Sequence, residues 1–537
     1  MTLDLTHWGL HAAAALSARG VDTIFTLTGG HIFLLYDGAR QAGIRLVDVR
    51  HEQTAAFAAE AYARLTRGPG VAAVTAGPGV FNTTSALATA ARNGSALVLF
   101  GGRAPNWRWG RGSLQEIDHV PVLAPLAKHA YTARPDLIRS LSSGIREALT
   151  APRGPLFLDV PLDLDPAGTL EDADRSPPER LVPDPDVLAR IAGAVGSARR
   201  PVLIAGSNVW ADGAAESLRA FAEASGIPVF ANGMGRGTLP HDHPSSFVRS
   251  RGKALREADL VFVAGTPIDF RLGFGEGWAS GAKIIHADSA PALLSPAPAT
   301  FASVGADLDL VFRGLVERAK KAAGADWVEA LRLEERRLEE SVVAERASAS
   351  DPIHPLRVYG ELARVLERDA IVIGDGGDFV SYAGREIRSS VPGSWLDPGP
   401  LGCLGLGPGA AMAARLVHPS RQVVVLTGDG AFGFAGLDFE SLVRNKLPVV
   451  FVMGNNGTWA LEKHAMRRYF AYDVVADLDS NTRYDRVVQA LGGHGERVTR
   501  PDEVGPALRR AFAAGVPALV EVMIDPAVVY PRHAELA

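Results

Sequence analysis

Residues Gln422–Leu461 read QVVVLTGDGAFGFAGLDFESLVRNKLPVVFVMGNNGTWAL. The segment contains two apolar runs, Gln422–Thr427 and Pro448–Met453, separated by a stretch that predicts a helix. Runs that are apolar along nearly their whole length are typical of strands covered on both faces by helices, as in a parallel sheet. Ligands of such sheets bind beyond the carboxyl ends of the strands. We therefore expect a binding site where these two strands end, at Asp429 and Asn456.

The residues at these two strand ends suit a hard cation next to an anion. Asp429 offers a carboxylate oxygen, Asn456 an amide oxygen and Thr458 a backbone carbonyl, and Mg²⁺ takes about six oxygens, several of them from phosphate and water. Gly428 and Gly430 let backbone N–H groups approach an anion at the positive end of the next helix. Two tight strand-to-helix turns also favour Gly, Asp and Asn. Because both turns lie on neighbouring strands, we favour a metal–diphosphate site.

The composition excludes several classes of protein. A length of 537 residues allows about three domains. The net charge of −5 provides no basic field for nucleic acid and no polybasic membrane patch. The single cysteine, Cys403, excludes an internal disulfide framework and is expected to be small and buried. Since no apolar window could span a bilayer and the N-terminus lacks a basic leader, we expect a cytoplasmic protein.

Alternating strand and helix patterns divide the chain into three regions, residues 1–165, 187–320 and 353–537. Such alternation predicts βαβ units and open parallel sheets. An acidic, proline-rich stretch at 163–186 is interpreted as a linker, and a charged helix at 326–347 leads into the third region. The expected strands lie at 23–27, 45–49, 71–75, 96–100, 201–205, 228–232, 260–264, 283–288, 370–374, 422–427, 448–453 and 518–524.

Two further segments accompany the strand ends. Arg50–Arg64 reads RHEQTAAFAAEAYAR, and Gly399–Gly409 reads GPLGCLGLGPG. With Gly-Asp-Gly at 428–430 and Asn-Asn at 455–456, they resemble the thiamine-diphosphate-dependent enzymes, and the likeness covers essentially the whole chain. Within that family the chain is similar to the acetohydroxyacid (acetolactate) synthase group, with features of benzaldehyde lyase. The resemblance implies an α/β fold of three open parallel-sheet domains: pyrimidine-binding, central and diphosphate-binding.

The resemblance assigns residues to the pyrimidine side of the coenzyme. Glu52 corresponds to the glutamate that shares a proton with the aminopyrimidine and so helps to form the reactive ylid; a buried carboxylate beside an apolar ring is expected to have a raised pKa. A structural explanation also exists, because an acid in the first turn of a helix complements its dipole. Leu404 would support the bent coenzyme, the carbonyl of Gly402 would accept from its 4′-amino group, and Pro78 would contact the ring.

On the diphosphate side the resemblance implies backbone contacts from Gly377, Asp378 and Phe379. Asp378 stands where typical synthases carry histidine, and an anionic side chain is not expected to touch a diphosphate. Magnesium ligands are expected from Asp429, Asn456 and Thr458. The other coenzyme contacts are expected from Gly29, Gly30, Gly428, Gly430, Ala431 and Trp459.

Several residues are candidates for the substrate side. His31 stands where typical synthases have alanine and benzaldehyde lyase has histidine, and an imidazole can relay the proton of a 2-hydroxyl group; a capping or structural histidine is the alternative. Gln115 is expected to donate to a carbonyl oxygen as charge develops on it. Arg108 and Arg111, in the same loop, suit a carboxylate, a CoA phosphate or a subunit contact.

The central region lacks a glycine fingerprint for a dinucleotide. Ala205–Asn208 is too short a signal, and Phe270–Gly275 only partly matches the flavin segment of the family. In typical synthases this domain binds FAD without redox work, and in related CoA lyases it binds a nucleotide. FAD, ADP or CoA, or no ligand at all, therefore stay open as alternatives for the central domain.

The predicted function is a thiamine-diphosphate- and Mg²⁺-dependent C–C lyase or carboligase. The leading reaction decarboxylates a 2-oxo acid such as pyruvate and passes the enamine to a carbonyl acceptor. The alternative, favoured by His31, is a lyase of 2-hydroxyacyl-CoA or of 2-hydroxy ketones. A remote alternative is an inactive, cofactor-binding regulatory subunit. The resemblance also implies a homodimer or homotetramer, with Glu52 facing the diphosphate half-site of its neighbour. From the composition we expect no nucleic-acid or membrane partner.

Overall fold

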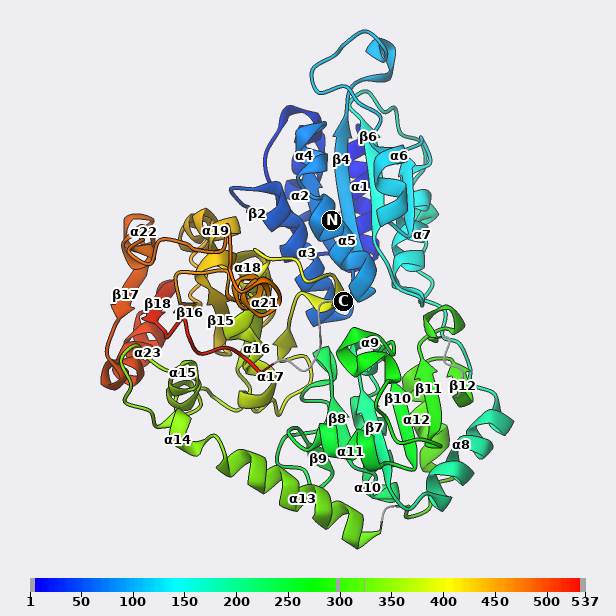
Figure 1. Ribbon diagram of the computed structural model, residues 1–537. Coiled ribbons are helices and arrows are strands. Elements are labelled where there is room, and N and C mark those ends of the chain that lie inside the picture. The colour runs from blue at the N-terminus through cyan, green and yellow to red at the C-terminus, as the bar shows by residue number, and fades with distance from the viewer. Residues whose placement is uncertain (1–4, 296–299, 323, 532–537) are drawn as a thin grey trace.

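The computed structural model describes residues 5–295, 300–322 and 324–531, which fold into three lobes around three sheets (Figure 1). Each sheet has six strands, and the described strand pairings are parallel. Parallel neighbours need a crossover connection, and helices supply it. This confirms the expected α/β class with three open parallel sheets.

The first sheet forms the blue-to-cyan lobe at the top of Figure 1 and has the strand order β2-β1-β3-β4-β6-β5. Its inner strands are buried along their length because helices cover both faces. The strands are β1 (Thr23–Thr26), β2 (Arg45–Asp48), β3 (Gly70–Val74), β4 (Leu97–Arg103), β5 (His129–Thr132) and β6 (Leu156–Pro161). The helices are α1 (Trp8–Ala18), α2 (Phe33–Ala42), α3 (Glu52–Thr66), α4 (Pro78–Phe81), α5 (Thr84–Asn93), α6 (Val120–Leu123) and α7 (Leu137–Leu149).

The central sheet, green in Figure 1, has the order β12-β11-β10-β7-β8-β9. The chain moves from β7 to opposite sides of the sheet, so the strand order reverses between β7 and β10. The strands are β7 (Pro201–Ala205), β8 (Val229–Ala231), β9 (Ser246–Phe247), β10 (Leu260–Ala264), β11 (Lys283–Asp288) and β12 (Thr300–Gly305). The helices are α8 (Pro185–Ser197), α9 (Ser207–Ala211), α10 (Ala215–Ser225), α11 (Arg251–Glu257) and α12 (Leu308–Val316).

The third sheet lies in the yellow-to-red lobe and has the order β14-β13-β15-β16-β18-β17. Its two strands from the opening segment, β15 and β16, are direct neighbours, as expected. The strands are β13 (Ile371–Asp375), β14 (Trp395–Leu396), β15 (Val423–Gly428), β16 (Val450–Asn455), β17 (His494–Val498) and β18 (Ala518–Met523). The helices are α15 (Pro355–Leu362), α16 (Asp378–Ser381), α17 (Ala383–Glu386), α18 (Gly407–Val417), α19 (Asp429–Ala435), α20 (Phe439–Arg444), α21 (Ala460–Phe470), α22 (Tyr484–Ala490) and α23 (Val504–Ala513).

The ends of the expected strands agree with the structure to within three residues, but six strands were not predicted: β5, β6, β9, β12, β14 and β17. Five of these, all except β6, are edge strands of their sheets. An edge strand has one paired side and is partly exposed, so it lacks the continuous apolar run of an inner strand. The sequence of β17, HGERV, illustrates this.

The first and third sheets share one apolar core. A single cluster of buried side chains includes residues of α3, β3 and β4 together with residues of β13, β15 and α18. The two helices α3 and α18 touch at backbone distance, because a Cβ on Gly409 would lie 2.7 Å from the carbonyl oxygen of Thr54. The Asp438 carboxylate fastens the contact by accepting from the Arg50 N–H at 2.7 Å and from the Thr54 hydroxyl at 2.6 Å. The central sheet has separate core clusters.

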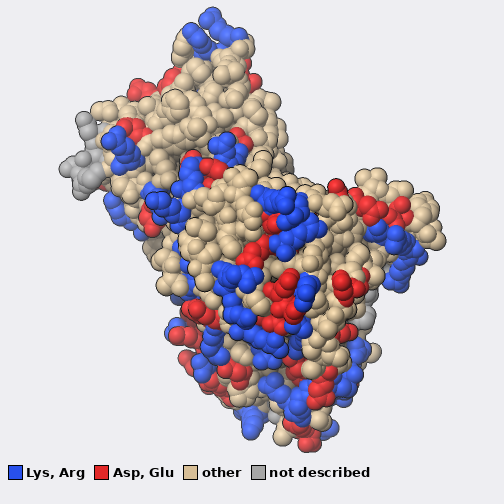
Figure 2. Space-filling view, turned by 90° about the vertical axis from the view of Figure 1, so that its left-hand side faces the viewer, with Lys and Arg blue, Asp and Glu red and all other residues tan. Residues whose placement is uncertain are grey.

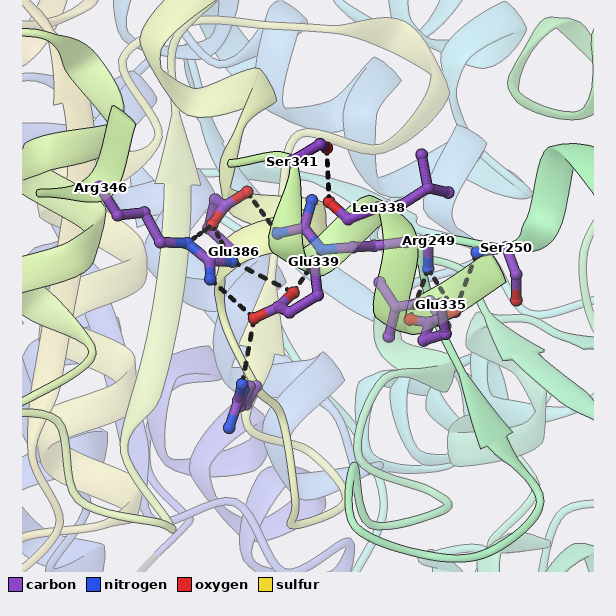
Figure 3. Close-up of polar contacts among 10 residues, drawn as sticks. Arg249, Ser250, Glu335, Leu338, Glu339, Ser341, Arg346 and Glu386 are labelled. Atoms are coloured by element: carbon purple, nitrogen blue, oxygen red, sulfur yellow. Dashed lines mark hydrogen bonds and ion pairs between the residues drawn. The ribbon is translucent and has the colours of Figure 1, made fainter. Parts of the chain in front are cut away.

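Helix α13 (Ala325–Glu340) runs from the central lobe to the third lobe along the bottom of Figure 1. The single helix expected over 326–347 is instead two, because α14 (Val343–Arg346) follows after a break. Glu339 of α13 and the buried Glu386 of α17 are bridged by Arg249, at 2.7 and 2.6 Å, and by Arg346, at 2.6 Å to each (Figure 3). This ion-pair cluster ties the central lobe to the third lobe.

The surface seen in Figure 2 carries acidic and basic side chains side by side over its lower part, while its upper part is largely uncharged. No helix in the described ranges is long and apolar enough to cross a membrane.

Candidate active site

The carboxyl edge of the third sheet gathers most residues of the predicted metal–diphosphate site. Asp429 is the first residue of α19 and is only 3% exposed. Burial raises the pKa of this carboxyl to about 6, although the backbone N–H groups of Asn456 and Gly457 favour its ionised form. Asp429 therefore lies against the turn that follows β16. Both turns converge, as the strand neighbourhood predicted.

Two glycines at this edge are in close contact with side chains that follow β16. A Cβ on Gly430 would lie 2.5 Å from the Trp459 ring, and a Cβ on Gly377 would lie 2.8 Å from Leu461. Gly377 ends the turn after β13, the other neighbour of β15. Because both residues are glycines, no side chain of their own covers the backbone N–H groups of these two turns. A cradle of this kind suits a diphosphate, which backbone N–H groups bind at helix N-termini.

The side chains of Asp378 and Phe379 are buried in the protein. Only the backbone of these two residues is therefore a candidate for contact with an anion. Asp378 is buried and its Oδ1 accepts from the Tyr530 N–H at 3.0 Å. Phe379 is 3% exposed. The expectation that the anionic side chain of Asp378 does not face a diphosphate agrees with this geometry.

The donor set at this edge fits magnesium. The Asn456 Oδ1 accepts from the Thr458 N–H at 3.3 Å, and the Thr458 hydroxyl donates to Ala476 O at 2.6 Å, which fixes the loop. Across the described residues no group of three or more His, Cys, Asp and Glu gathers to hold a metal. One carboxylate with amide and carbonyl oxygens is nevertheless usual for Mg²⁺, which takes its other ligands from phosphate and water.

Asp375, which ends β13, positions the loop that was expected to support the coenzyme. Its carboxylate is buried and accepts from the Gly405 N–H at 2.9 Å and the Gly407 N–H at 2.8 Å. Burial raises the pKa of Asp375 to about 6. The sequence analysis gave Asp375 no separate role. The feature that could have indicated one is an acidic residue at the end of an apolar strand. Cys403, in the same loop, is partly exposed, so the expectation of a buried residue was wrong.

Glu52 begins α3 in the first lobe. Its Oε2 accepts from Asn82 Nδ2 at 3.0 Å, and a Cβ on Gly79 would lie 3.6 Å from Oε1. In the single chain Glu52 is only half-buried, so the expectation of a buried carboxylate was wrong for one subunit. The side chain lies beside the turn that leads into α4, where Pro78 was expected to contact the ring.

His31 and Gln115 meet at Thr75. The Thr75 hydroxyl lies 3.1 Å from His31 Nδ1 and donates to Gln115 Oε1 at 3.3 Å. Burial lowers the pKa of His31, although the backbone of Leu114 favours the charged ring. His31 is therefore neutral near pH 7 and able to accept a proton. The two predicted substrate residues are brought together by a threonine.

A buried network behind this group was missed by the sequence analysis. The Gly77 N–H donates to His119 Nε2 at 2.8 Å, so Nδ1 carries the proton and donates to Asp159 at 2.8 Å. Asp159 also pairs with Arg103 at 2.8 Å. Gly77 has φ +59, and a Cβ there would lie 3.0 Å from the Gln115 Cβ. His119 and Asp159 lie 40 residues apart, and no local motif connects them.

The structure brings the predicted residues together in two groups. One, in the first lobe, contains Glu52, Pro78, His31 and Gln115; the other, in the third lobe, contains Gly377, Asp429, Asn456 and Trp459. Within the described residues of a single chain, no hydrogen bond or ion pair joins the two groups. Of the remaining candidates, Gly29 packs against Thr75, and Arg108 lies over the ring of Trp107.

In the crevice where the central strand order reverses, the loop after β7 packs against the loop after β10. The Asn208 N–H donates to Gly265 O at 3.0 Å, and its side chain donates to Asp288 at 2.7 Å. A Cβ on Gly206 would lie 2.3 Å from Gly265 O. Trp210 closes the side toward the first lobe by donating to Arg64 O at 2.8 Å. The backbone N–H that would bind a pyrophosphate here is already used.

Three family models match the chain. They are the thiamine pyrophosphate enzyme N-terminal TPP binding domain at residues 8–122, the central domain at 188–315 and the C-terminal TPP binding domain at 375–522. The matches fall in turn on the first, central and third sheets, and β5 and β6 of the first sheet lie beyond the first match.

Curated relatives agree with these matches. An acetolactate synthase large subunit of Mycobacterium tuberculosis and a probable acetolactate synthase of Mycobacterium bovis are each 50% identical over 99% of this chain and 98% of their own length. A 2-hydroxyacyl-CoA lyase 2 of Caenorhabditis elegans is 36% identical over 92% of this chain and 84% of its own.

Proposed function

The chain belongs to the thiamine-diphosphate-dependent enzymes, in which it is acetolactate-synthase-like, and we propose that it decarboxylates a 2-oxo acid such as pyruvate and transfers the remaining fragment to a carbonyl acceptor. The observation that carries the proposal is the convergence of Asp429, the Asn456–Gly457 turn and Gly377 at neighbouring strand ends. This is where a metal-bound diphosphate fits.

We assign the pyrimidine-binding role to residues 1–165, a central domain to 187–320 and the diphosphate-binding role to 353–537. In the third domain Asp429, Asn456 and the carbonyl of Thr458 would hold Mg²⁺. Backbone groups of residues 377–379 and 428–431 would hold the diphosphate. Leu404 and the Gly402 carbonyl would support the middle of the coenzyme, in a loop that Asp375 fixes.

Thiamine diphosphate supplies a carbon nucleophile for the substrate carbonyl and takes up the electron pair released when the neighbouring C–C bond breaks. Glu52 would hold a proton at the pyrimidine ring nitrogen. Gln115 would donate to the substrate oxygen as negative charge develops there. His31, neutral near pH 7, would take or return the proton of a substrate hydroxyl group.

A complete site would need two copies of the chain. Glu52 is half-exposed, and no hydrogen bond or ion pair of the described residues connects it to the Asp429 group in one subunit. We infer a homodimer or homotetramer in which each first domain faces the third domain of a neighbour. Dilution that dissociates the assembly should abolish turnover, and activity of a verified monomer would contradict this arrangement.

A lyase acting on 2-hydroxyacyl-CoA or 2-hydroxy ketones is the second candidate. His31 favours it, because cleavage of a 2-hydroxy compound begins with removal of the hydroxyl proton. The relative of C. elegans carries the name 2-hydroxyacyl-CoA lyase 2 at lower identity. An inactive regulatory subunit is not supported, since Glu52, Asp429 and Asn456 are all in place.

Incubation with coenzyme and Mg²⁺ discriminates the two reactions. Pyruvate, benzoin and a 2-hydroxyacyl-CoA are offered separately, and the products are identified by mass spectrometry. Acetolactate and CO₂ from pyruvate would support the synthase; aldehyde release from either of the other substrates would support the lyase. No product from any of the three would contradict both.

We propose that no FAD or ADP occupies the crevice between β7 and β10. The Asn208 amide and the Gly206 position are blocked by backbone of Gly265, so the residues do not fit a pyrophosphate there. The purified protein should be colourless in the flavin region of the absorbance spectrum. For the whole protein we propose a cytoplasmic location and no nucleic-acid partner.

A further inference from the structure

Thr75 lies between the two candidate substrate residues at the carboxyl edge of the first sheet. It directly follows β3, which pairs with β1 on one side and with β4 on the other. Its hydroxyl oxygen is 3.1 Å from His31 Nδ1 and 3.3 Å from Gln115 Oε1. One side chain therefore contacts both residues that are candidates for contact with the substrate.

Two glycines hold the Thr75 side chain in one orientation. A Cβ on Gly79 would lie 2.8 Å from Thr75 Cγ2, and a Cβ on Gly29 would lie 3.0 Å from the same methyl carbon. The methyl group thus packs against the backbone of both turns. Because a β-branched side chain is also restricted at χ1, the hydroxyl group is kept directed at His31 and Gln115.

The two partners of Thr75 are fixed by close backbone contacts as well. A Cβ on Gly102 would lie 2.4 Å from His31 Cβ, so the histidine packs directly against β4. Gln115 has φ +59, which residues other than glycine rarely adopt, and a Cβ on Gly77 would lie 3.0 Å from its Cβ. Backbone strain of this kind clusters at functional sites. The three side chains therefore form a rigid group.

The single hydrogen of the Thr75 hydroxyl determines the hydrogen-bond roles in this group. A glutamine Oε1 only accepts, so Thr75 donates to Gln115. Nδ1 of His31 must then carry a proton and donate to Thr75 Oγ1, which leaves the lone pair on Nε2. Gln115 Nε2 keeps two hydrogens, and it donates to no other group in the described part of the chain.

We propose that Thr75 is a positioning residue, which holds the proton of His31 on Nδ1 and turns the amide nitrogen of Gln115 toward the substrate oxygen. Nε2 of His31 then takes the proton of a substrate hydroxyl group, and the oxygen keeps the electron pair of the broken O–H bond. Gln115 Nε2 donates to that oxygen. This role in turnover rests on the proposed function, whereas the tautomer of His31 does not.

Nitrogen NMR tests the tautomer without substrate. Protein labelled with nitrogen-15 histidine is saturated with thiamine diphosphate and Mg²⁺ at pH 8, and the His31 signals are assigned by their loss in His31→Gln. The wild type should show the Nδ1–H form. Thr75→Val has the same shape without the hydroxyl group and should shift the ring to the Nε2–H form that free histidine prefers. A wild-type ring protonated on Nε2 would overturn the proposal.

Steady-state kinetics test the role in turnover, with pyruvate, benzoin and a 2-hydroxyacyl-CoA as probes. For the probe that is turned over, Thr75→Val should lower kcat about 10–10³-fold, part of the 10²–10⁴ that general acid–base groups contribute. KM should change less than threefold. Thr75→Ser keeps the hydroxyl group and should retain at least a third of the wild-type kcat. A wild-type kcat in Thr75→Val would contradict the proposal.

Thr89→Val is the matched control, because it removes a buried hydroxyl of the first lobe that donates to Ser85 O at 2.9 Å within α5. It should keep the wild-type kcat, and thermal unfolding compares the stability of both variants. An equal loss of kcat in Thr89→Val and Thr75→Val would overturn the positioning role. If no probe is turned over while the His31 tautomer still depends on Thr75, the proposed function fails and the tautomer assignment stands.

Discussion

At the scale of single residues, burial sets the protonation of several carboxyl groups. Asp375 and Asp429 at the third sheet have pKa values raised to about 6, and Asp288 at the central sheet has one raised to about 7. In each case loss of water around the carboxylate outweighs the hydrogen bonds that it accepts. The fold loses stability as pH rises through these pKa values, unless a cation neutralises the carboxylate.

Glu52→Gln tests the assignment of the acid at the pyrimidine. Gln is isosteric and keeps an oxygen for Asn82, so coenzyme affinity should change by less than threefold. Turnover should fall by about 10²–10⁴, the usual contribution of general acid–base groups. Coenzyme titration and steady-state kinetics measure the two effects.

The matched control for this substitution is Glu216→Gln, which removes an acid from the first turn of α10. If Glu52 only complements a helix dipole, both variants will show the same small loss of stability and normal turnover. That result would remove Glu52 from the proposed chemistry.

Asp288→Asn tests the cost of a buried carboxylate. Asp288 has a folded pKa of about 7 against an ordinary 3.8, so the folded state holds the proton more tightly than the unfolded state. The stability from this group is complete below the ordinary value and is lost as pH rises through about 7. The neutral variant should melt several degrees higher than the wild type at pH 8, since each kcal/mol is worth about 2–4 °C.

The gain should shrink as pH falls from 8 toward 4, which circular dichroism melts can follow. Asn keeps the oxygen that accepts from Asn208, while Asp288 Oδ2 has no hydrogen-bond partner to lose. Asp165→Asn, at an exposed position, is the control. A variant that melts lower than the wild type at pH 8 would show that the carboxylate charge stabilises the domain.

At the scale of elements, the strand-to-helix turns position the candidate active-site residues. Asp429 and Asn456 could be placed from the sequence because apolar inner strands are easy to recognise and parallel neighbours end at one edge. His119 and Asp159 could not be placed, because their partners are distant in sequence and each residue looks ordinary in its own segment. Edge strands such as β17 were not predicted because their sequences lack a continuous apolar run.

Gly430→Ala tests the cradle at the start of α19. The added methyl group would lie 2.5 Å from the Trp459 ring, so the ring or the turn must move away from the diphosphate position. Coenzyme affinity should fall about 10–100-fold, the effect of about 1.4–2.8 kcal/mol. Gly433→Ala lies in the same helix with open space around its Cβ position and should bind normally. Equal affinity of the two variants would rule out this contact as a determinant of binding.

His119→Phe tests the network behind the Gly77 turn. The substitution leaves the buried Gly77 N–H without its acceptor, which should cost about 1–3 kcal/mol of stability. Coenzyme affinity should fall as well, because the turn positions Pro78. His119→Gln restores an acceptor and should recover part of both losses. If Gln and Phe behave alike in melting and in coenzyme titration, the hydrogen bond does not position the turn.

At the scale of the whole molecule, the three lobes are joined in unequal ways. The first and third sheets are joined through one apolar core, with α3 against α18. The central lobe is joined to the third through charged groups around Glu339 and Glu386 (Figure 3) and through close packing of Trp210 against Gly393. Removing one partner of a fully buried ion pair lowers the free energy of unfolding by about 3–5 kcal/mol, because the other charge is left unpaired. These pairs are only partly buried, so the loss should be smaller.

The shared core has a consequence for how the protein comes apart. Two sheets that bury their side chains against each other form one cooperative unit, whereas a lobe with its own core can lose its structure separately. Heating should therefore give two calorimetric peaks, the smaller from unfolding of the central lobe. The first and third lobes, which carry the two groups of candidate active-site residues, should unfold together in the larger peak. High salt, which screens the charged junction, should move the two peaks further apart.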